Sequence, residues 1–163
     1  MSNECYSFLF CNMEVLNMEN KIVGDICKLQ NGIICHQVNC QRKMGKGLAL
    51  QIRKKFIQHY LEYINTEPEL GKILTTEISS ELYIAALYSQ YYFGSTGKVF
   101  TDYKAFKECL KLLKDFSHTK KLTIYIPYKI GCGLGGGDWN IIYSVIKEIL
   151  DEYTIVFPHP YLV

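Results

Sequence analysis

Residues 131–139 read Gly-Cys-Gly-Leu-Gly-Gly-Gly-Asp-Trp and hold five of the twelve glycines of the 163-residue chain. This stretch follows an apolar, β-branched run (122–128) and precedes an amphipathic run (140–150), a pattern typical of a loop between a strand and a helix. Glycines leave backbone amides accessible, and amides that open a helix are well placed to hold a phosphate group. A flexible turn is the alternative interpretation. An earlier glycine turn, Gly45-Lys46-Gly47, favours the phosphate site.

The composition is that of one ordinary globular domain. The chain is 48% hydrophobic and 21% charged, and its length allows a core to form without disulfides. A net charge of +2 is too small for a protein that binds nucleic acid through charge alone. The region around the earlier glycine turn is nevertheless basic, which suits an anionic small ligand, although a solvated helix face would explain it too. The basic residues are Arg42, Lys43, Lys46, Arg53, Lys54 and Lys55.

The cysteines indicate a reducing compartment. There are seven, an odd number without paired spacing, and the apolar stretch at residues 6–11 is too short for a secretion signal or a membrane span. We therefore expect a cytoplasmic, monomeric protein that does not enter a membrane. Cys35, His36 and Cys40 lack a second pair of ligands at finger-like spacing, so neither a metal site nor a cofactor is predicted.

Hydrophobic periodicity predicts strands that alternate with helices. Residues 1–19 are expected to be an N-terminal extension with a possible edge strand, and residues 20–163 to form the domain. The predicted strands are 21–26, 32–38, 72–78, 81–89, 122–128 and 154–157, and the predicted helices are 47–64, a segment capped by Thr101 or Asp102 that ends near 116, and 140–150.

This order predicts an α/β fold with a mixed, largely parallel sheet covered by helices on both faces. Ligands of such sheets bind beyond the carboxyl ends of the strands. Loops 39–47, 90–100 and 131–138 all follow predicted strands and should converge there, together with Asp25.

Two familiar nucleotide-binding motifs are excluded by their context. Gly131-x-Gly133-x-x-Gly136 matches the dinucleotide fingerprint, but only one predicted strand follows it. The ribose-binding acid of that fold lies at the end of the second strand of the βαβ unit, whereas Asp151 lies before the strand. The segment 45–48 lacks the spacing and the Ser/Thr of a Walker loop.

Three ordered motifs resemble a macro domain over about residues 21–158. They are Gly24-Asp25-Ile26; His36-Gln37-Val38-Asn39-Cys40-Gln41 followed by Met44-Gly45-Lys46-Gly47-Leu48-Ala49; and Ile126-Pro127-Tyr128-Lys129-Ile130-Gly131-Cys132-Gly133-Leu134 with Trp139. The residues of these motifs are similar to those of phage and bacterial macro domains and of the subgroup that contains ADP-ribose-1″-phosphate phosphatases and terminal ADP-ribose hydrolases. The resemblance implies a three-layer α/β/α sandwich that binds ADP-ribose.

The resemblance also implies roles for individual residues. Asp25 would accept a hydrogen bond from the adenine amino group, with the Ile26 amide beside it, and Asn39 would orient the distal ribose. An ordinary aspartate turn is the alternative for Asp25. The two glycine loops would hold the ribose and the diphosphate through Gly45, Lys46, Gly47 and Leu48 and through Gly131, Cys132, Gly133, Leu134, Gly135, Gly136 and Gly137. Tyr92 or Phe93 would pack on a ligand ring or in the core.

Catalysis is less fully specified by the motifs. His36 matches a histidine of the phosphatase-like subgroup and is a candidate general acid or base, with a satisfied core histidine as the alternative. Relatives that form a covalent sugar adduct use a lysine and an aspartate where this chain has Gln90 and Gly135. A glutamine cannot form an imine, so that mechanism is not carried over. Asp138, three residues further on, is a candidate to stand in partly for the missing aspartate or to cap its helix, and the cap is the preferred interpretation.

Two functions follow. The first is hydrolysis of an ADP-ribose derivative, by an ADP-ribose-1″-phosphate phosphatase or an ADP-ribosyl hydrolase. The second is a non-catalytic module that recognises ADP-ribose on a protein or nucleic acid. The expected partner is ADP-ribose or an ADP-ribosylated substrate, and nucleic acid only where it carries ADP-ribose.

Overall fold

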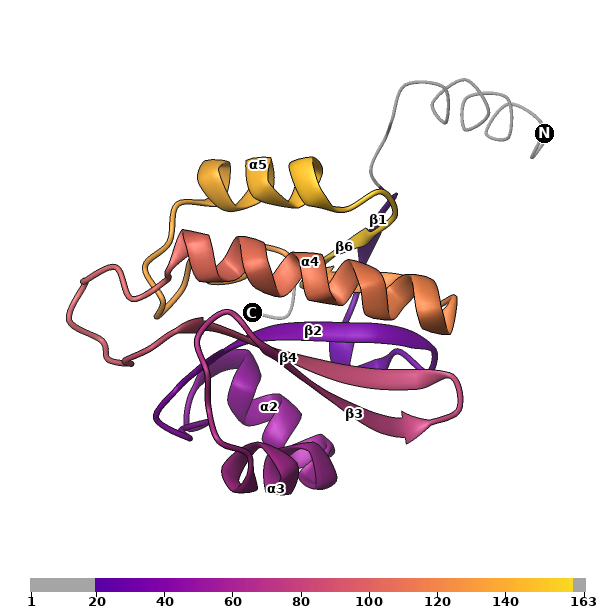
Figure 1. The fold of residues 1–163 in the computed structure, drawn as a ribbon, viewed down its shortest axis with the longest axis horizontal. Coiled ribbons are helices and arrows are strands. Elements are labelled where there is room, and N and C mark those ends of the chain that lie inside the picture. The colour runs from indigo at the N-terminus through magenta and orange to yellow at the C-terminus, as the bar shows by residue number, and fades with distance from the viewer. Residues whose placement is uncertain (1–19, 160–163) are drawn as a thin grey trace.

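The computed structural model describes residues 20–159, and the predicted N-terminal extension lies outside this range. Six strands form one sheet between two helical layers (Figure 1). The elements are β1 (Asn20–Val23), the 3-10 helix η1 (Ile26–Lys28), β2 (Gly32–Asn39), α2 (Gly47–Lys55), α3 (Ile57–Asn65), β3 (Ile73–Ser79), β4 (Leu82–Gln90), α4 (Tyr103–Lys120), β5 (Ile124–Pro127), α5 (Trp139–Ile149) and β6 (Thr154–Phe157).

The sheet is mixed and largely parallel, which confirms the predicted fold class. Its strand order is β1-β6-β5-β2-β4-β3, and β3 alone runs antiparallel to its neighbour. Every residue of β4 is buried, because helices cover both faces of a parallel sheet, and this is why the strand reads as a continuous apolar run.

The two faces of the sheet pack on different helices. Side chains alternate along β2, so Ile33 and Cys35 join the core under α4 and α5, whereas Ile34 and Val38 join the apolar clusters beside α2 and α3. In Figure 1, α4 and α5 lie on one side of the sheet and α2 and α3 on the other. This is the expected three-layer α/β/α sandwich.

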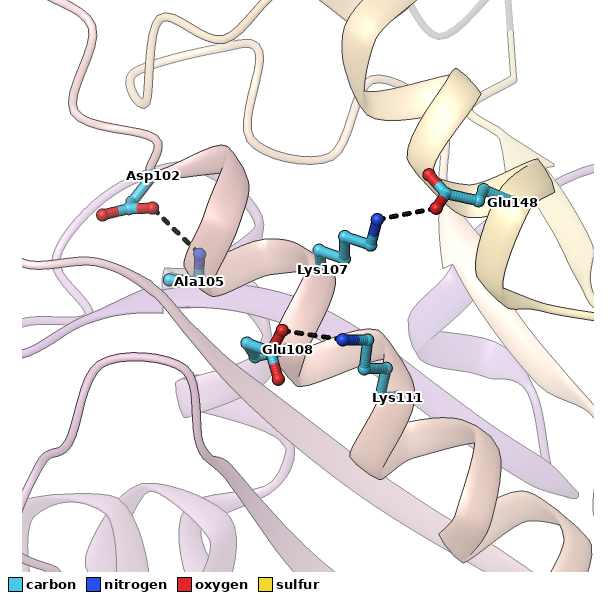
Figure 2. A network of polar contacts seen from close by, with 6 residues as sticks. All are labelled: Asp102, Ala105, Lys107, Glu108, Lys111 and Glu148. Carbon is cyan, nitrogen blue, oxygen red and sulfur yellow. Dashed lines mark hydrogen bonds and ion pairs between the residues drawn. The ribbon is translucent and has the colours of Figure 1, made fainter.

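Polar contacts cap α4 and join it to α5 (Figure 2). The carboxylate of Asp102 accepts a hydrogen bond from the Ala105 amide at 2.9 Å and so caps α4. The ammonium of Lys107 on α4 lies 2.6 Å from the carboxylate of Glu148 on α5. Asp138 caps α5 by accepting from the Asn140 amide at 2.8 Å, as predicted.

The prediction of one helix over residues 47–64 is wrong, because the helix breaks at Phe56. Phe56 leaves the helical region (φ −117°, ψ 66°) and packs into the core, and α3 starts again at Ile57. The break turns His59 and Tyr63 of α3 inward, where both are fully buried. His59 makes buried hydrogen bonds to His36 and Thr76, and Tyr63 makes one to Asn39. The break is therefore favoured by tertiary contacts of α3.

The remaining boundaries agree with the prediction to within a few residues. The largest difference is at α4, which continues to Lys120, about one turn beyond the predicted end. Lys121 ends it in the left-handed conformation (φ 56°). No helix among residues 20–159 combines the length and the apolar character needed to cross a membrane.

Candidate functional site

A cavity of about 930 Å³ lies at the carboxyl edge of the parallel strands. The loops after β2, β4 and β5, which the sequence predicted to converge, all line it, and so does the turn after β1 that carries Asp25. The residues after β6, Pro158 and His159, line it as well and were not predicted. The signal for them was present, because the last parallel strand must also end at this edge.

Most of the residues predicted for ligand binding line this cavity. They are Asp25, Ile26, His36, Asn39, Gly45, Lys46, Gly47, Leu48, Gly131, Gly133, Leu134 and Gly135. Cys132, Gly136 and Gly137 are not among the lining residues. Cys132 packs against the core under α5, and Gly136 and Gly137 lie against the Lys98 and Gly131 carbonyls, where an added Cβ would come within 2.5 Å and 2.8 Å of oxygen.

Two runs of backbone amides along the cavity have no hydrogen-bond acceptor in the described part of the chain. One comprises Gly133, Leu134 and Gly135, and the other runs over residues 45–49 into the first turn of α2. No side chain caps α2, in contrast to α4 and α5, which begin at capping aspartates. Unpaired amides at a helix start and in a glycine loop favour an anionic group between them.

The side chains around the cavity add positive charge. Asp25 is the single acidic side chain among the described lining residues, against Arg42, Lys43, Lys46, Arg53 and Lys129. Arg42 forms an ion pair with Glu67 at 2.9 Å, and the guanidinium of Arg53 lies 4.3 Å from the ring centre of Tyr60. This balance of charge favours a ligand with phosphate groups.

Asp25 acts as a helix cap and also lines the cavity. Its Oδ1 accepts a hydrogen bond from the Cys27 amide at 2.9 Å and caps η1. The second carboxylate oxygen makes no hydrogen bond to the described residues and remains an acceptor for a ligand. The two interpretations of Asp25 from the sequence are therefore compatible.

Asn39 is largely occupied with holding its own loop. Its Oδ1 accepts hydrogen bonds from the amides of Gln41 and Lys43, and its Nδ2 donates to the Lys43 carbonyl at 2.8 Å. The hydroxyl of Tyr63 donates to the backbone carbonyl of Asn39 at 2.7 Å. One N–H of the amide is left for the cavity. Asn39 therefore both holds the turn at residues 41–43 and lines the cavity.

Gln90 ties the loops around the cavity together. Its Oε1 accepts from Gln37 Nε2 at 2.7 Å and its Nε2 donates to the Tyr92 carbonyl at 2.8 Å. Gln37 Nε2 also donates to Thr101 Oγ1, which in turn donates to the Gly131 carbonyl at 2.7 Å. This network connects the loop after β4 to the glycine loop and gives Gln90 a structural role.

His36 lies buried on β2 and lines the cavity. Its Nε2 is 2.9 Å from Nε2 of the buried His59 on α3, and its Nδ1 has no hydrogen-bond partner among residues 20–159. Burial lowers the pKa of His36 well below its ordinary value, and the adjacent His59 lowers it further. Burial also lowers the pKa of His59, with a partial offset from Glu62. Both rings are neutral at neutral pH.

No three histidine, cysteine, aspartate or glutamate side chains in the described range are close enough to hold a metal ion. Cys35 and His36 illustrate why. As neighbours on β2 they point to opposite faces of the sheet, Cys35 to the core under α4 and His36 toward α3.

Several known proteins are similar to this chain, although no protein-family model matches it. An uncharacterised 17.5 kDa protein of the tk-vs intergenic region of Enterobacteria phage T4 is 34% identical over 148 residues, covering 82% of this chain and 88% of the phage protein. A DNA ADP-ribosyl glycohydrolase of Mycobacterium tuberculosis is 20% identical over 146 residues. The alignment covers 83% of this chain but only 40% of that protein.

Solved structures share the fold. A protein of unknown function from Bacteroides thetaiotaomicron is 30% identical with a TM-score of 0.74, over 86% of this chain and 98% of that chain. The macrodomain of Mycobacterium tuberculosis DarG is 19% identical with a TM-score of 0.69, over 86% and 97% of the two chains. The structure of Thermosipho africanus DarTG in complex with ADP-ribose is 19% identical with a TM-score of 0.69, and the match covers 88% of this chain and 43% of that chain. Together with the cavity at the carboxyl edge, these similarities show that the chain has the macro domain fold.

Proposed function

We propose that this macro domain binds ADP-ribose in the cavity and hydrolyses a bond at the distal ribose of an ADP-ribose derivative. The observation that carries the proposal is the pair of unpaired amide runs, residues 45–49 and 133–135, along one basic cavity. A diphosphate supplies the acceptors that such amides need. The cavity volume lies within the range of about 300 to 1,000 Å³ that is usual for small-molecule sites.

The rest of the cavity suits the rest of this ligand. The free oxygen of Asp25 would accept a hydrogen bond from the adenine amino group. His36, with its unpartnered nitrogen, would serve proton transfer at the distal ribose. The substrate class is supported by DarTG, which was solved with ADP-ribose, and by the mycobacterial relative, a DNA ADP-ribosyl glycohydrolase.

A non-catalytic reader of ADP-ribose is the second candidate. The position of Gln90 favours it, because the resemblance places this glutamine where covalent relatives carry a lysine, and its amide bonds to Gln37 and to the Tyr92 carbonyl. The reader would recognise ADP-ribose on a protein or nucleic acid without turnover.

Binding is tested by calorimetry with ADP-ribose and the variant Asp25→Ala. We expect the affinity to fall by about 1 to 3 kcal/mol, the cost of losing a hydrogen-bond partner in a desolvated site. The control is Asp102→Ala, which also removes a helix-capping carboxylate but at α4, outside the lining residues. Unchanged affinity in folded Asp25→Ala would remove Asp25 from the binding site.

Turnover is tested separately with ADP-ribose-1″-phosphate and a panel of 1″-linked ADP-ribosyl esters. The enzyme hypothesis predicts release of phosphate or free ADP-ribose by the wild-type protein. Tight ADP-ribose binding with product at background for every substrate would leave the reader function.

A further inference from the structure

A chain of hydrogen bonds leads from the surface of the protein to His36. Nε2 of His36 on β2 meets Nε2 of His59 on α3 at 2.9 Å, and Nδ1 of His59 meets Oγ1 of Thr76 on β3 at 2.8 Å. Oγ1 of Thr76 lies 2.6 Å from Oε2 of Glu62, one turn after His59 on α3. His36, His59 and Thr76 are buried, and Glu62 is half-buried.

The chemistry of these groups fixes the direction of every hydrogen bond. Both oxygens of the Glu62 carboxylate accept, Oε1 from Gln58 Nε2 and Oε2 from the Thr76 hydroxyl. Since the Thr76 hydrogen is used on Glu62, its oxygen must accept from His59 Nδ1–H. In a neutral ring Nε2 of His59 is then bare and accepts from His36 Nε2–H.

Nδ1 of His36 is consequently a bare acceptor. It is buried and unpartnered in the described structure, on a residue that lines the cavity. A buried polar atom without a partner is unfavourable, whereas a purely structural histidine would be expected to satisfy both nitrogens. The unsatisfied nitrogen indicates a group that meets its partner when a ligand or water is bound.

We propose that Glu62, Thr76 and His59 are positioning residues that hold His36 in the Nε2–H tautomer, so that Nδ1 takes the proton of the attacking water. This inference rests on the proposed hydrolysis. As the water proton moves to Nδ1, its oxygen bonds to the electrophilic centre at the 1″ linkage. The leaving oxygen departs with the electron pair of the broken bond and receives the proton back from His36. The chain ending on a carboxylate stabilises the imidazolium formed in between, as in other histidine relays.

The tautomers are measured directly by NMR of the full-length protein labelled with ¹⁵N at histidine, through long-range ring couplings at neutral pH. We expect His36 to carry its proton on Nε2 and His59 on Nδ1. The opposite assignment for either ring would overturn the inference. This readout does not require turnover.

Thr76→Val removes the hydroxyl from this chain with little change in volume. In this variant we expect mixed tautomers at His59 and His36. We expect kcat to fall about tenfold or more, because general base catalysis contributes about 10²- to 10⁴-fold, while KM and ADP-ribose affinity stay within about twofold. Thr76→Ser keeps the hydroxyl and should restore the wild-type values.

The matched control is Thr75→Val, on the same strand with its side chain on the opposite face, which should leave tautomers and kcat unchanged. A wild-type kcat in folded Thr76→Val, or no rescue by Thr76→Ser, would overturn the positioning role. If the wild type shows the expected tautomers but hydrolyses no substrate, the proposed hydrolysis fails and the catalytic use of the chain fails with it. If the wild-type protein hydrolyses substrate but its histidines have other tautomers, only the positioning role of the hydrogen-bond chain is refuted.

Discussion

The paired histidines are two titratable rings that are almost completely buried. Burial lowers the pKa of both His36 and His59, and each stays neutral in the folded protein under conditions in which an unfolded chain would begin to protonate. Folding therefore releases protons at mildly acidic pH. The pair links the stability of the whole domain to pH.

This linkage predicts acid sensitivity. Below the unfolded histidine pKa of about 6.5 the unfolded chain binds more protons than the folded one, so the free energy of unfolding falls as pH falls. At pH 5 the loss is about 2 kcal/mol for each histidine that stays neutral when folded. Urea unfolding at pH 7.5 and pH 5.0 measures it.

Variants separate the pair from other titrating groups. A double variant, His36→Gln with His59→Gln, should show a smaller loss of stability between the two pH values. Equal pH dependence in the double variant and the wild type would contradict the assignment.

Within the glycine loop, individual glycines serve different purposes. Gly136 adopts φ 68°, and a Cβ there would lie 2.5 Å from the Lys98 carbonyl oxygen, so this glycine packs the back of the loop against the segment before α4. At Gly133 a Cβ would meet no heavy atom within 4 Å beyond the chain neighbours, and the position lines the cavity. One glycine therefore supports the loop, and the other leaves room for a ligand.

Alanine at these two positions should separate stability from binding. Gly136→Ala is expected to lower the free energy of unfolding by at least about 2 kcal/mol, from the left-handed backbone and the clash with a carbonyl. Gly133→Ala should change stability by less than about 0.5 kcal/mol and weaken ADP-ribose binding. Chemical unfolding and calorimetry on both variants provide the measurements. A Gly136→Ala protein as stable as wild type would contradict the packing argument.

Across the whole molecule, five parallel strands deliver their carboxyl ends to one edge, and the cavity occupies that edge. The elements that line the cavity are loops held by the sheet and by polar networks such as the one around Gln37 and Gln90. Because the site joins loops that are distant in sequence, a ligand that binds there stabilises the folded chain only when all of them are in place.

Ligand binding should therefore raise the melting temperature. At a free ADP-ribose concentration about 100 times Kd the free energy of unfolding rises by about 2.7 kcal/mol, which corresponds to roughly 5 to 10 °C for a domain of this size. Differential scanning calorimetry over a concentration series measures the shift. The same series with Asp25→Ala should require higher concentrations for an equal shift. A melting temperature that does not change up to millimolar ADP-ribose would contradict binding in the cavity.

The sequence was sufficient for much of the fold and most of the cavity lining. Strand and helix periods, and the aspartates before α4 and α5, are local signals, and they predicted the layers and the loops after β2, β4 and β5. They did not predict the break at Phe56. No proline or glycine marks it, and the apolar spacing of Leu48, Ile52, Phe56 and Tyr60 continues through it.

The amino-acid sequence by itself determined a mixed, largely parallel sheet with two glycine loops and an aspartate at one edge, because these features follow from repeats and turns within short segments. Only the tertiary structure decided which glycines face the cavity, that Asn39 and Gln90 are occupied in holding loops, and that His36 is connected through His59 and Thr76 to Glu62. The physical reason is that such contacts join elements that are distant in the sequence; the hydrogen bonds from His36 to Glu62, for example, join β2, α3 and β3. The side chains of His59 and Glu62 can make these bonds only because α3 changes direction after the break at Phe56, and no local sequence pattern predicts that change.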